Sequence, residues 1–352
     1  MGQIYVQDSL RKKKRAIKDA LGNDILRYIA ELLTNSDDSY RRLENQNIDS
    51  NKEKVIYIEL KKEKRKSADN SDSYVLSVTD NAEGMTLETL ERIFGTYGED
   101  NAGGTQLHAR GIFGQGASDV LRASAKEKRT ALIETIKDNS VSKLYYNMDE
   151  NLTPIINTEK VELSENRLND YRNNLRIPQN GTKISFGIPA NVKFTDKIKD
   201  NLAELIAKYP SFRYLLNQDN RKIIYVYEGK ETIISSKEYQ FKDENEIAKE
   251  RFSFIYEGKS IDCELKLYLN ENKKNDETNI IVCDENYSVF DNTMFDFQNY
   301  PSAQVVSGEL IIKGLYNLCY EHLNAEEPDA IVRDNRTCLL YTSDAADDRI
   351  SV

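Results

Sequence analysis

Apolar residues recur at helical spacing in the first part of the chain. Ile25, Ile29 and Leu32 share one face with their apolar neighbours Leu26 and Leu33. This pattern predicts a helix over residues 23–43 that is capped by Asn23 or Asp24.

Nearly continuous apolar runs and then mixed patterns follow this helix. Residues 55–60 and 74–79 predict two antiparallel strands joined by a long charged loop. A helix at 87–94 and a short helix from Ala117 are separated by a glycine-rich stretch, residues 95–116, which is long enough to be a lid or binding loop. Three more strands are predicted at residues 131–137, 143–148 and 182–188.

The pattern starts again after Pro189. A helix is predicted near residues 202–209, and strands are predicted at 222–227, 252–256, 264–269 and 279–282, with a strand and then a helix over 309–323. We therefore expect a first domain over residues 1–189 and a second, smaller α+β domain over 190–337. Residues 338–352 resemble translated sequencing-adapter read-through, so a non-native tail is expected there.

The composition of the chain argues against several classes of protein, including membrane-spanning and disulfide-rich proteins. The chain has 59 acidic and 49 basic residues, for a net charge of −10, which argues against bulk attraction to nucleic acid or anionic membranes, although a local basic patch stays possible. No apolar run is long enough to span a membrane, and the basic residues 11–15 are not followed by the apolar core of a signal peptide. Four widely spaced cysteines predict neither a zinc site nor a disulfide framework, so a reduced, cytoplasmic protein is expected.

One polar motif lies on the first long helix. Glu31, Asn35 and Asp38 stand at i, i+4 and i+7, and they project from the side opposite the apolar stripe. A carboxylate there could accept a proton from water, and an amide oxygen one turn away could coordinate Mg²⁺. A solvated helix face is the alternative interpretation.

Three further motifs follow in the chain. Asp80 begins the sequence DNAEGM directly after a strand, where it could accept a hydrogen bond from an exocyclic amine, or could equally close an Asx turn. Gly84 would allow a planar ring to approach the backbone closely. The glycines of RGIFGQGAS, residues 110–118, could direct backbone N–H groups at an anion before a helix, and Thr182 of GTKISF could bridge a carboxylate and a ligand nitrogen.

The order and spacing of these four motifs resemble the GHKL ATPase superfamily, which includes gyrase B subunits, ninety-kilodalton heat-shock chaperones, sensor histidine kinases, MutL and MORC proteins. The similarity covers residues 24–188, and it is greater to the chaperone, MutL and gyrase B types, because Glu31 is present and a phospho-acceptor histidine motif is absent. The resemblance implies a Bergerat-type mixed sheet with helices on one face, an α+β sandwich, followed by a transducer-like second domain.

The resemblance also implies roles for individual residues. Glu31 matches the general base, Asn35 matches the magnesium ligand, and Asp80 matches the carboxylate that reads the adenine amino group with support from Thr182. Further expected contacts to the nucleotide are Asp38, Gly84, Met85, Gly111, Phe113, Gly114 and Gly116. Ala82 departs from the family pattern, because a glycine is usual at that position.

The expected activity is slow, Mg²⁺-dependent ATP hydrolysis that closes a lid and drives an ATP-dependent homodimer. ATP and Mg²⁺ are thus the expected cofactors, a protein client is left unspecified, and no membrane partner is expected. Two alternatives remain: a nucleotide-gated interaction module without turnover, and the ATPase part of a topoisomerase-like or mismatch-repair-like machine that meets nucleic acid only through missing domains. A second-domain cation is expected to reach the γ-phosphate, with Arg213, Arg221, Lys222 and Lys313 as candidates.

Overall fold

The computed structural model divides into two compact units, Met1–Ser235 and Ser236–Val352. It describes residues 9–48, 53–63, 73–95, 116–209, 212–216, 218–235, 245–269, 280–285, 289–294, 297, 299–315 and 317–318. The predicted tail at residues 338–352 lies outside the described residues. No helix within the described part is long and apolar enough to cross a membrane.

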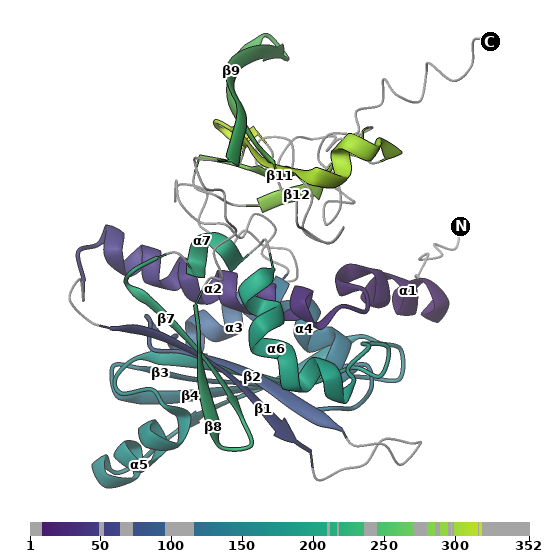
Figure 1. Ribbon diagram of the computed structural model, residues 1–352. Coiled ribbons are helices and arrows are strands. Elements are labelled where there is room, and N and C mark those ends of the chain that lie inside the picture. The colour runs from purple at the N-terminus through teal and green to yellow at the C-terminus, as the bar shows by residue number, and fades with distance from the viewer. Residues whose placement is uncertain are drawn as a thin grey trace, which may run out of the picture. The chain divides into compact units, whose positions relative to one another are not determined.

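Unit 1 is built on one mixed sheet of eight strands in the order β5-β4-β3-β6-β2-β1-β7-β8 (Figure 1). All neighbouring strands are antiparallel except β1 and β7, which are parallel. The strands are β1 (Lys54–Lys62), β2 (Tyr74–Asp80), β3 (Ala131–Lys137), β4 (Ser140–Met148), β5 (Pro154–Val161), β6 (Gly181–Gly187), β7 (Arg221–Tyr227) and β8 (Lys230–Ile234). The helices are α1 (Leu10–Leu21), α2 (Ile25–Asn45), α3 (Leu87–Gly95), α4 (Gly116–Ala125), α5 (Glu165–Leu175), α6 (Asp196–Lys208) and α7 (Arg213–Leu216).

The main core lies between one face of this sheet and most of the helices. Alternate residues of β1, such as Ile56 and Ile58, are fully buried against the apolar stripes of α2 and its neighbours. The helices α1, α2, α3, α4, α6 and the short α7 contribute to this one cluster. The predicted mixed sheet is confirmed, and most but not all of its helices cover one face.

One helix lies on the opposite face of the sheet. Leu168 and Leu175 of α5 pack with Ile136 and Val141 in a cluster separate from the main core. Figure 1 shows α5 below the sheet, on the side away from α2. The segment between the predicted strands at 143–148 and 182–188 is polar, so neither α5 nor β5 was predicted from it. Because β5 is an edge strand with mostly exposed residues, it lacks the apolar alternation that reveals a strand.

Unit 2 contains a separate five-stranded sheet in the order β12-β11-β13-β10-β9. Its elements are β9 (Glu246–Tyr256), β10 (Lys259–Leu269), β11 (Ile280–Cys283), β12 (Val289–Thr293), the 3₁₀ helix η5 (Pro301–Val305) and β13 (Val306–Ile312). The sequence predicts a helix after β13 that ends at residue 323, and most of this predicted helix lies outside the described residues.

The division between units differs from the predicted boundary after residue 189. The β7–β8 hairpin pairs with β1, and α6 packs into the main core through Leu202 and Ile206. Residues 190–235 therefore complete the first sheet and its core instead of opening a second domain.

Candidate functional site

Helix α2 supplies the first wall of the site. Asp24 caps it as one of the two predicted alternatives, and its side chain accepts a hydrogen bond from the N–H of Leu26 at 3.0 Å. The apolar stripe faces the core, but Ser36, Asp37 and Asp38 are also buried. On the face that carries the predicted motif, Asp38 is buried and Glu31 and Asn35 are half-buried, so this face is not fully solvated.

A cavity of about 460 Å³ joins α2 to the end of β2, the following turn and β6. The predicted site residues that line it are Asn35, Asp38, Asp80, Gly84, Met85 and Thr182. They come from segments far apart in the sequence and meet because β6 pairs with β2, with Thr182 directly opposite Asp80. The arrangement thus has an acidic and amide-bearing helix on one side and a buried carboxylate on the other.

Glu31 of α2 lies beside this cavity, where its side chain contacts Gly116, the first residue of α4. A Cβ atom added to Gly116 would overlap the Glu31 carboxylate, so the carboxylate lies directly against the backbone there. Ala117 and Ser118, which follow Gly116, line the cavity, whereas Glu31 is not among its lining residues. Gly116 is thereby placed by its contact with Glu31, while Gly111, Phe113 and Gly114 lie outside the described residues.

Asp80 is a buried carboxylate with several hydrogen-bond donors. One of its oxygens accepts from the Ser36 hydroxyl at 3.1 Å, and the other accepts from the N–H of Ala82 at 3.0 Å. Burial raises the pKa of Asp80 to about 6 from its usual 3.8, although these hydrogen bonds oppose the shift. The methyl group of Ala82 is buried in the core cluster, so the departure from glycine is accommodated by packing.

Thr135 is a site residue that the sequence analysis missed. Its hydroxyl is 3.2 Å from that of Thr182, lies 3.1 Å from the carbonyl oxygen of Gly181, and accepts the N–H of Met85 at 2.8 Å. Asp80, Thr182 and Thr135 form a polar row across three neighbouring strands, because the register places Thr182 opposite both. The sequence signal that could have identified Thr135 is a threonine within the largely apolar run of β3.

The packing of the turn after Asp80 requires glycine at one position. Gly84 has a φ of +64°, and a Cβ there would collide with the carbonyl oxygen of Ile136. The close approach is thus between the turn and β3. Gly84 also lines the cavity.

Charged side chains form the rim of the cavity. Glu83, which sequence reasoning could not place, accepts hydrogen bonds from Ser39 at 3.0 Å and from Arg42 at 2.8 Å. Arg42, Arg92 and Lys137 all line the cavity, and none of them was predicted as a site residue. The cavity lining thus holds three cations and three carboxylates, with Arg42 paired to Glu83, so charged groups of both signs face a ligand.

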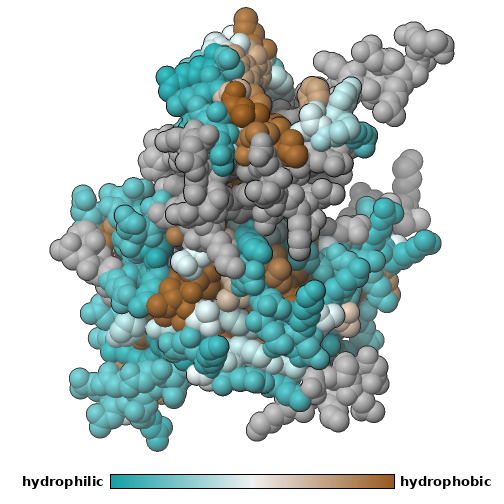
Figure 2. Space-filling view, in the orientation of Figure 1, coloured by the Kyte–Doolittle hydropathy of each residue, from teal (hydrophilic) through white to brown (hydrophobic). Residues whose placement is uncertain are grey.

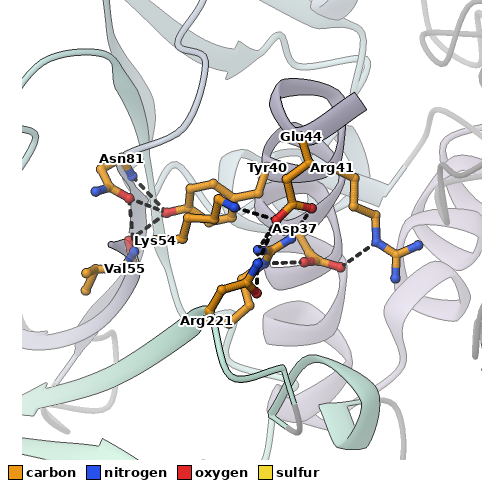
Figure 3. A network of polar contacts seen from close by, with 9 residues as sticks. Asp37, Tyr40, Arg41, Glu44, Lys54, Val55, Asn81 and Arg221 are labelled. Atoms are coloured by element: carbon orange, nitrogen blue, oxygen red, sulfur yellow. Dashed lines mark hydrogen bonds and ion pairs between the residues drawn. The ribbon is translucent and has the colours of Figure 1, made fainter. Parts of the chain in front are cut away.

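A polar network behind the cavity holds α2 against the sheet (Figure 3). The Tyr40 hydroxyl lies within hydrogen-bond distance of the Asn81 side-chain oxygen and the carbonyl oxygen of Val55, which share its single proton, and it accepts the N–H of Asn81. The Asn81 side-chain oxygen also accepts the N–H of Val55. Asn81 follows Asp80 in the chain, so these bonds fix the position of the buried carboxylate.

Glu44, also on α2, belongs to the same network. Burial alone would raise the pKa of Glu44, but Arg221 and Lys54 lower it to about 2.

The candidates for a γ-phosphate cation are mostly engaged elsewhere. Arg221 has a side chain 2% exposed and pairs with Asp37 at 2.8 Å and with Glu44 at 2.7 Å. Lys222 pairs with Glu53, and Lys313 of unit 2 pairs with Asp262. Arg221 and Lys222 also belong to unit 1, not to the second unit, and the side chain of Arg213 lies outside the described residues.

Comparisons with known proteins give structural likeness at low identity. No protein-family model matches the chain, and no curated protein matches it. The B subunit of DNA gyrase from Myxococcus xanthus is similar to this chain at 12% identity and a TM-score of 0.38, covering 80% of this chain and 78% of the gyrase chain. The ATPase and transducer domains of DNA topoisomerase II from Balamuthia mandrillaris are similar at 12% identity and a TM-score of 0.44, covering 82% and 76% respectively.

Proposed function

We propose that unit 1 binds ATP together with Mg²⁺ and hydrolyses it slowly, in the manner of the GHKL ATPases that its motifs resemble. The single observation that carries this proposal is the cavity of about 460 Å³ that gathers Asn35, Asp38, Asp80 and Thr182. Its volume lies within the range typical of small-molecule sites. The greater similarity to the chaperone and MutL types stays a prediction from motifs alone.

The residues present fit a purine base at the inner end of the cavity. Asp80 is buried and held by Ser36 and Ala82, so an ionised carboxylate there is positioned to accept a hydrogen bond from an exocyclic amine. The hydroxyl of Thr182 stands opposite on the paired strand, where Thr135 orients it. Met85 and Ile184 supply apolar lining for the flat faces of a base.

The residues at the other end fit a metal-bound phosphate chain. Within the described residues no group of three or more His, Cys, Asp or Glu gathers to hold a metal ion. Mg²⁺ commonly takes one or two protein ligands and completes its shell with phosphate oxygens and water, so the Asn35 amide oxygen suffices as the protein ligand. Bound Mg²⁺ would neutralise charge on the phosphates during hydrolysis.

Glu31 is proposed as the general base. It stands one helical turn before Asn35 on α2, and its carboxylate lies against the start of α4 at Gly116. A carboxylate fixed there orients a water molecule and accepts its proton as the water attacks. The N-terminus of α4 adds a favourable dipole for the negatively charged end of the ligand. Lid closure and ATP-dependent homodimerisation are part of the same proposal.

The test is phosphate release with Mg²⁺ and ATP by the wild type and by Glu31→Gln. We expect the variant to release phosphate at least about a hundredfold more slowly, with ATP binding measured by calorimetry nearly unchanged. Glu150→Gln, an exposed position in the turn after β4, is the matched control and should keep the wild-type rate.

Two outcomes would count against hydrolysis by this site. Equal rates for wild type and Glu31→Gln would remove Glu31 as the base. Binding of ATP with no phosphate release by either protein would instead support a nucleotide-gated interaction module without turnover.

A further inference from the structure

Helix α1 concentrates positive charge in an acidic chain. Six of its twelve residues are Lys or Arg, in LRKKKRAIKDAL, whereas the whole chain has a net charge of −10. Its first turn contains no acidic residue. Cations at a helix N-terminus oppose the helix dipole, and like charges four residues apart repel, so this composition is unfavourable for the helix itself.

The apolar residues of α1 anchor it in unit 1. Ile17 is 4% exposed and Leu21 is fully buried, and both belong to the main core cluster. Ser9 caps the helix by accepting from the N–H of Lys12, and Lys13 donates to the carbonyl oxygen of Asn151. The helix is thus held in place by its apolar stripe, by Ser9 and by Lys13.

The remaining cations form one exposed row. Arg11, Lys14 and Lys18 are exposed, and at about 100° per residue they project within about 60° of one another. The row from Arg11 to Lys18 is about 10 Å long. Lys12 and Arg15 flank it and are also exposed, although both have interactions within the chain. In the view of Figure 2 the surface over α1 is hydrophilic.

We propose that this row, which we call the α1 cationic face, binds the phosphate backbone of duplex nucleic acid. Duplex DNA carries one negative charge per about 1.7 Å of its axis, so a row of this length meets several phosphates. The face has no aromatic side chain on which an unpaired base could stack, which favours a duplex over a single strand. Binding is therefore independent of base sequence.

Other anionic partners suit the face less well. Insertion into a membrane needs an exposed apolar face, but Ile17 and Leu21 are used in the core and Leu10 is the large apolar side chain of α1 that is exposed. A protein partner would need a central apolar or aromatic anchor, and the cationic face offers none. The inference is independent of the proposed ATPase activity and differs from the sequence-based expectation that nucleic acid is reached only through missing domains.

The test uses the full chain and a fluorescently labelled 30-base-pair duplex of arbitrary sequence. Anisotropy titrations are made from 50 to 200 mM salt for the wild type and for the triple variant Arg11→Gln, Lys14→Gln, Lys18→Gln. We expect the variant to bind at least about tenfold more weakly at 50 mM salt, and the slope of log K against log salt to become shallower by about two to three. Glutamine forms helices well, and circular dichroism verifies that the variant stays folded.

The matched control removes the same charge elsewhere. Lys160, Lys193 and Lys197 are exposed on other elements, and their replacement by glutamine should leave the affinity and salt slope nearly unchanged. Arg11→Lys keeps the charge and should bind like the wild type. An equal loss in the control triple variant, or no duplex binding by the wild type, would overturn the proposal. Tight binding to phosphatidylserine vesicles or polyglutamate in place of the duplex would overturn it as well.

Discussion

Asp80 is a buried carboxylate, and its proposed role in binding a ligand amine requires the ionised form. Its side chain lies beside Ser36 and Thr182, and burial favours the neutral form. The same burial strengthens a hydrogen bond from a ligand amine, because no water competes for the oxygen. The ionised form of Asp80 is therefore expected to lower the stability of the folded protein and to strengthen ligand binding.

The substitution Asp80→Asn tests this trade. The pKa of Asp80 is raised in the folded protein to about 6 from 3.8, so the contribution of Asp80 to stability is fully present below pH 3.8 and is lost as the pH rises through about 6. The variant has no charge to bury and should be more stable than the wild type at pH 7 by up to about 3 kcal/mol, with the difference disappearing near pH 4. Urea unfolding at the two pH values measures this.

Nucleotide affinity should move in the opposite direction. Asp80→Asn is expected to weaken ATP binding at least about tenfold, because an amide offers its nitrogen where an acceptor is needed. A variant that is no more stable than the wild type at pH 7 would refute the charged, buried state of Asp80, whatever its affinity.

Helix α2 and strand β7 are joined by a buried ion network rather than by apolar contacts alone. Asp37 is fully buried between Arg41 and Arg221, and Arg221 also reaches Glu44 and lies over the Tyr40 ring. Figure 3 shows these side chains converging between the helix and the strands. The network holds the helix that carries Glu31 and Asn35 in register with the sheet.

Replacing Arg221 by methionine should destabilise the protein by about 3 kcal/mol or more, because the buried carboxylate of Asp37 loses a partner. Lys222→Met is the matched control: its side chain is 38% exposed and pairs with Glu53, so a loss under about 1 kcal/mol is expected. Guanidinium unfolding of both variants gives the comparison, and similar losses would contradict a structural role specific to Arg221.

Acid stability supplies a second measurement of the network. The pKa of Glu44 is lowered to about 2 from 4.5, so its contribution is present above pH 4.5 and is lost as the pH falls towards 2. Arg221→Met should reduce this acid-dependent part of the stability. The side chain is partly exposed, so the effect is smaller than for a fully buried pair.

At the scale of the whole molecule, the first sheet needs residues beyond the predicted boundary. A chain of residues 1–235 retains all eight strands and Arg221, whereas residues 1–189 lack α6, α7, β7 and β8. In the shorter chain β1 becomes an unpaired edge, and Leu202 and Ile206 are missing from the core.

We expect residues 1–235 to unfold cooperatively as a soluble chain and residues 1–189 to aggregate or to lack a sharp transition. Thermal circular dichroism and size-exclusion chromatography distinguish these behaviours. Cooperative unfolding of both chains at the same temperature would show that residues 190–235 are dispensable for unit 1.

The sequence by itself determined the local elements of the site. The apolar stripe and cap specify α2, and the apolar runs specify β1, β2, β3 and β6, because these patterns depend on neighbours within a few residues. Three residues that the motifs singled out, Asn35, Asp80 and Thr182, line one cavity, whereas Glu31 is not among its lining residues. Their roles stay a prediction.

Only the tertiary structure decided how those elements complete one another. The strand register brings Thr135 to Thr182, the return of β7 to the edge of β1 buries Arg221 against Asp37, and the packing of the turn on β3 requires Gly84. Such contacts join residues separated by long stretches of chain. No local pattern encodes them, because the free energy of burying and pairing those groups arises only once the sheet has assembled.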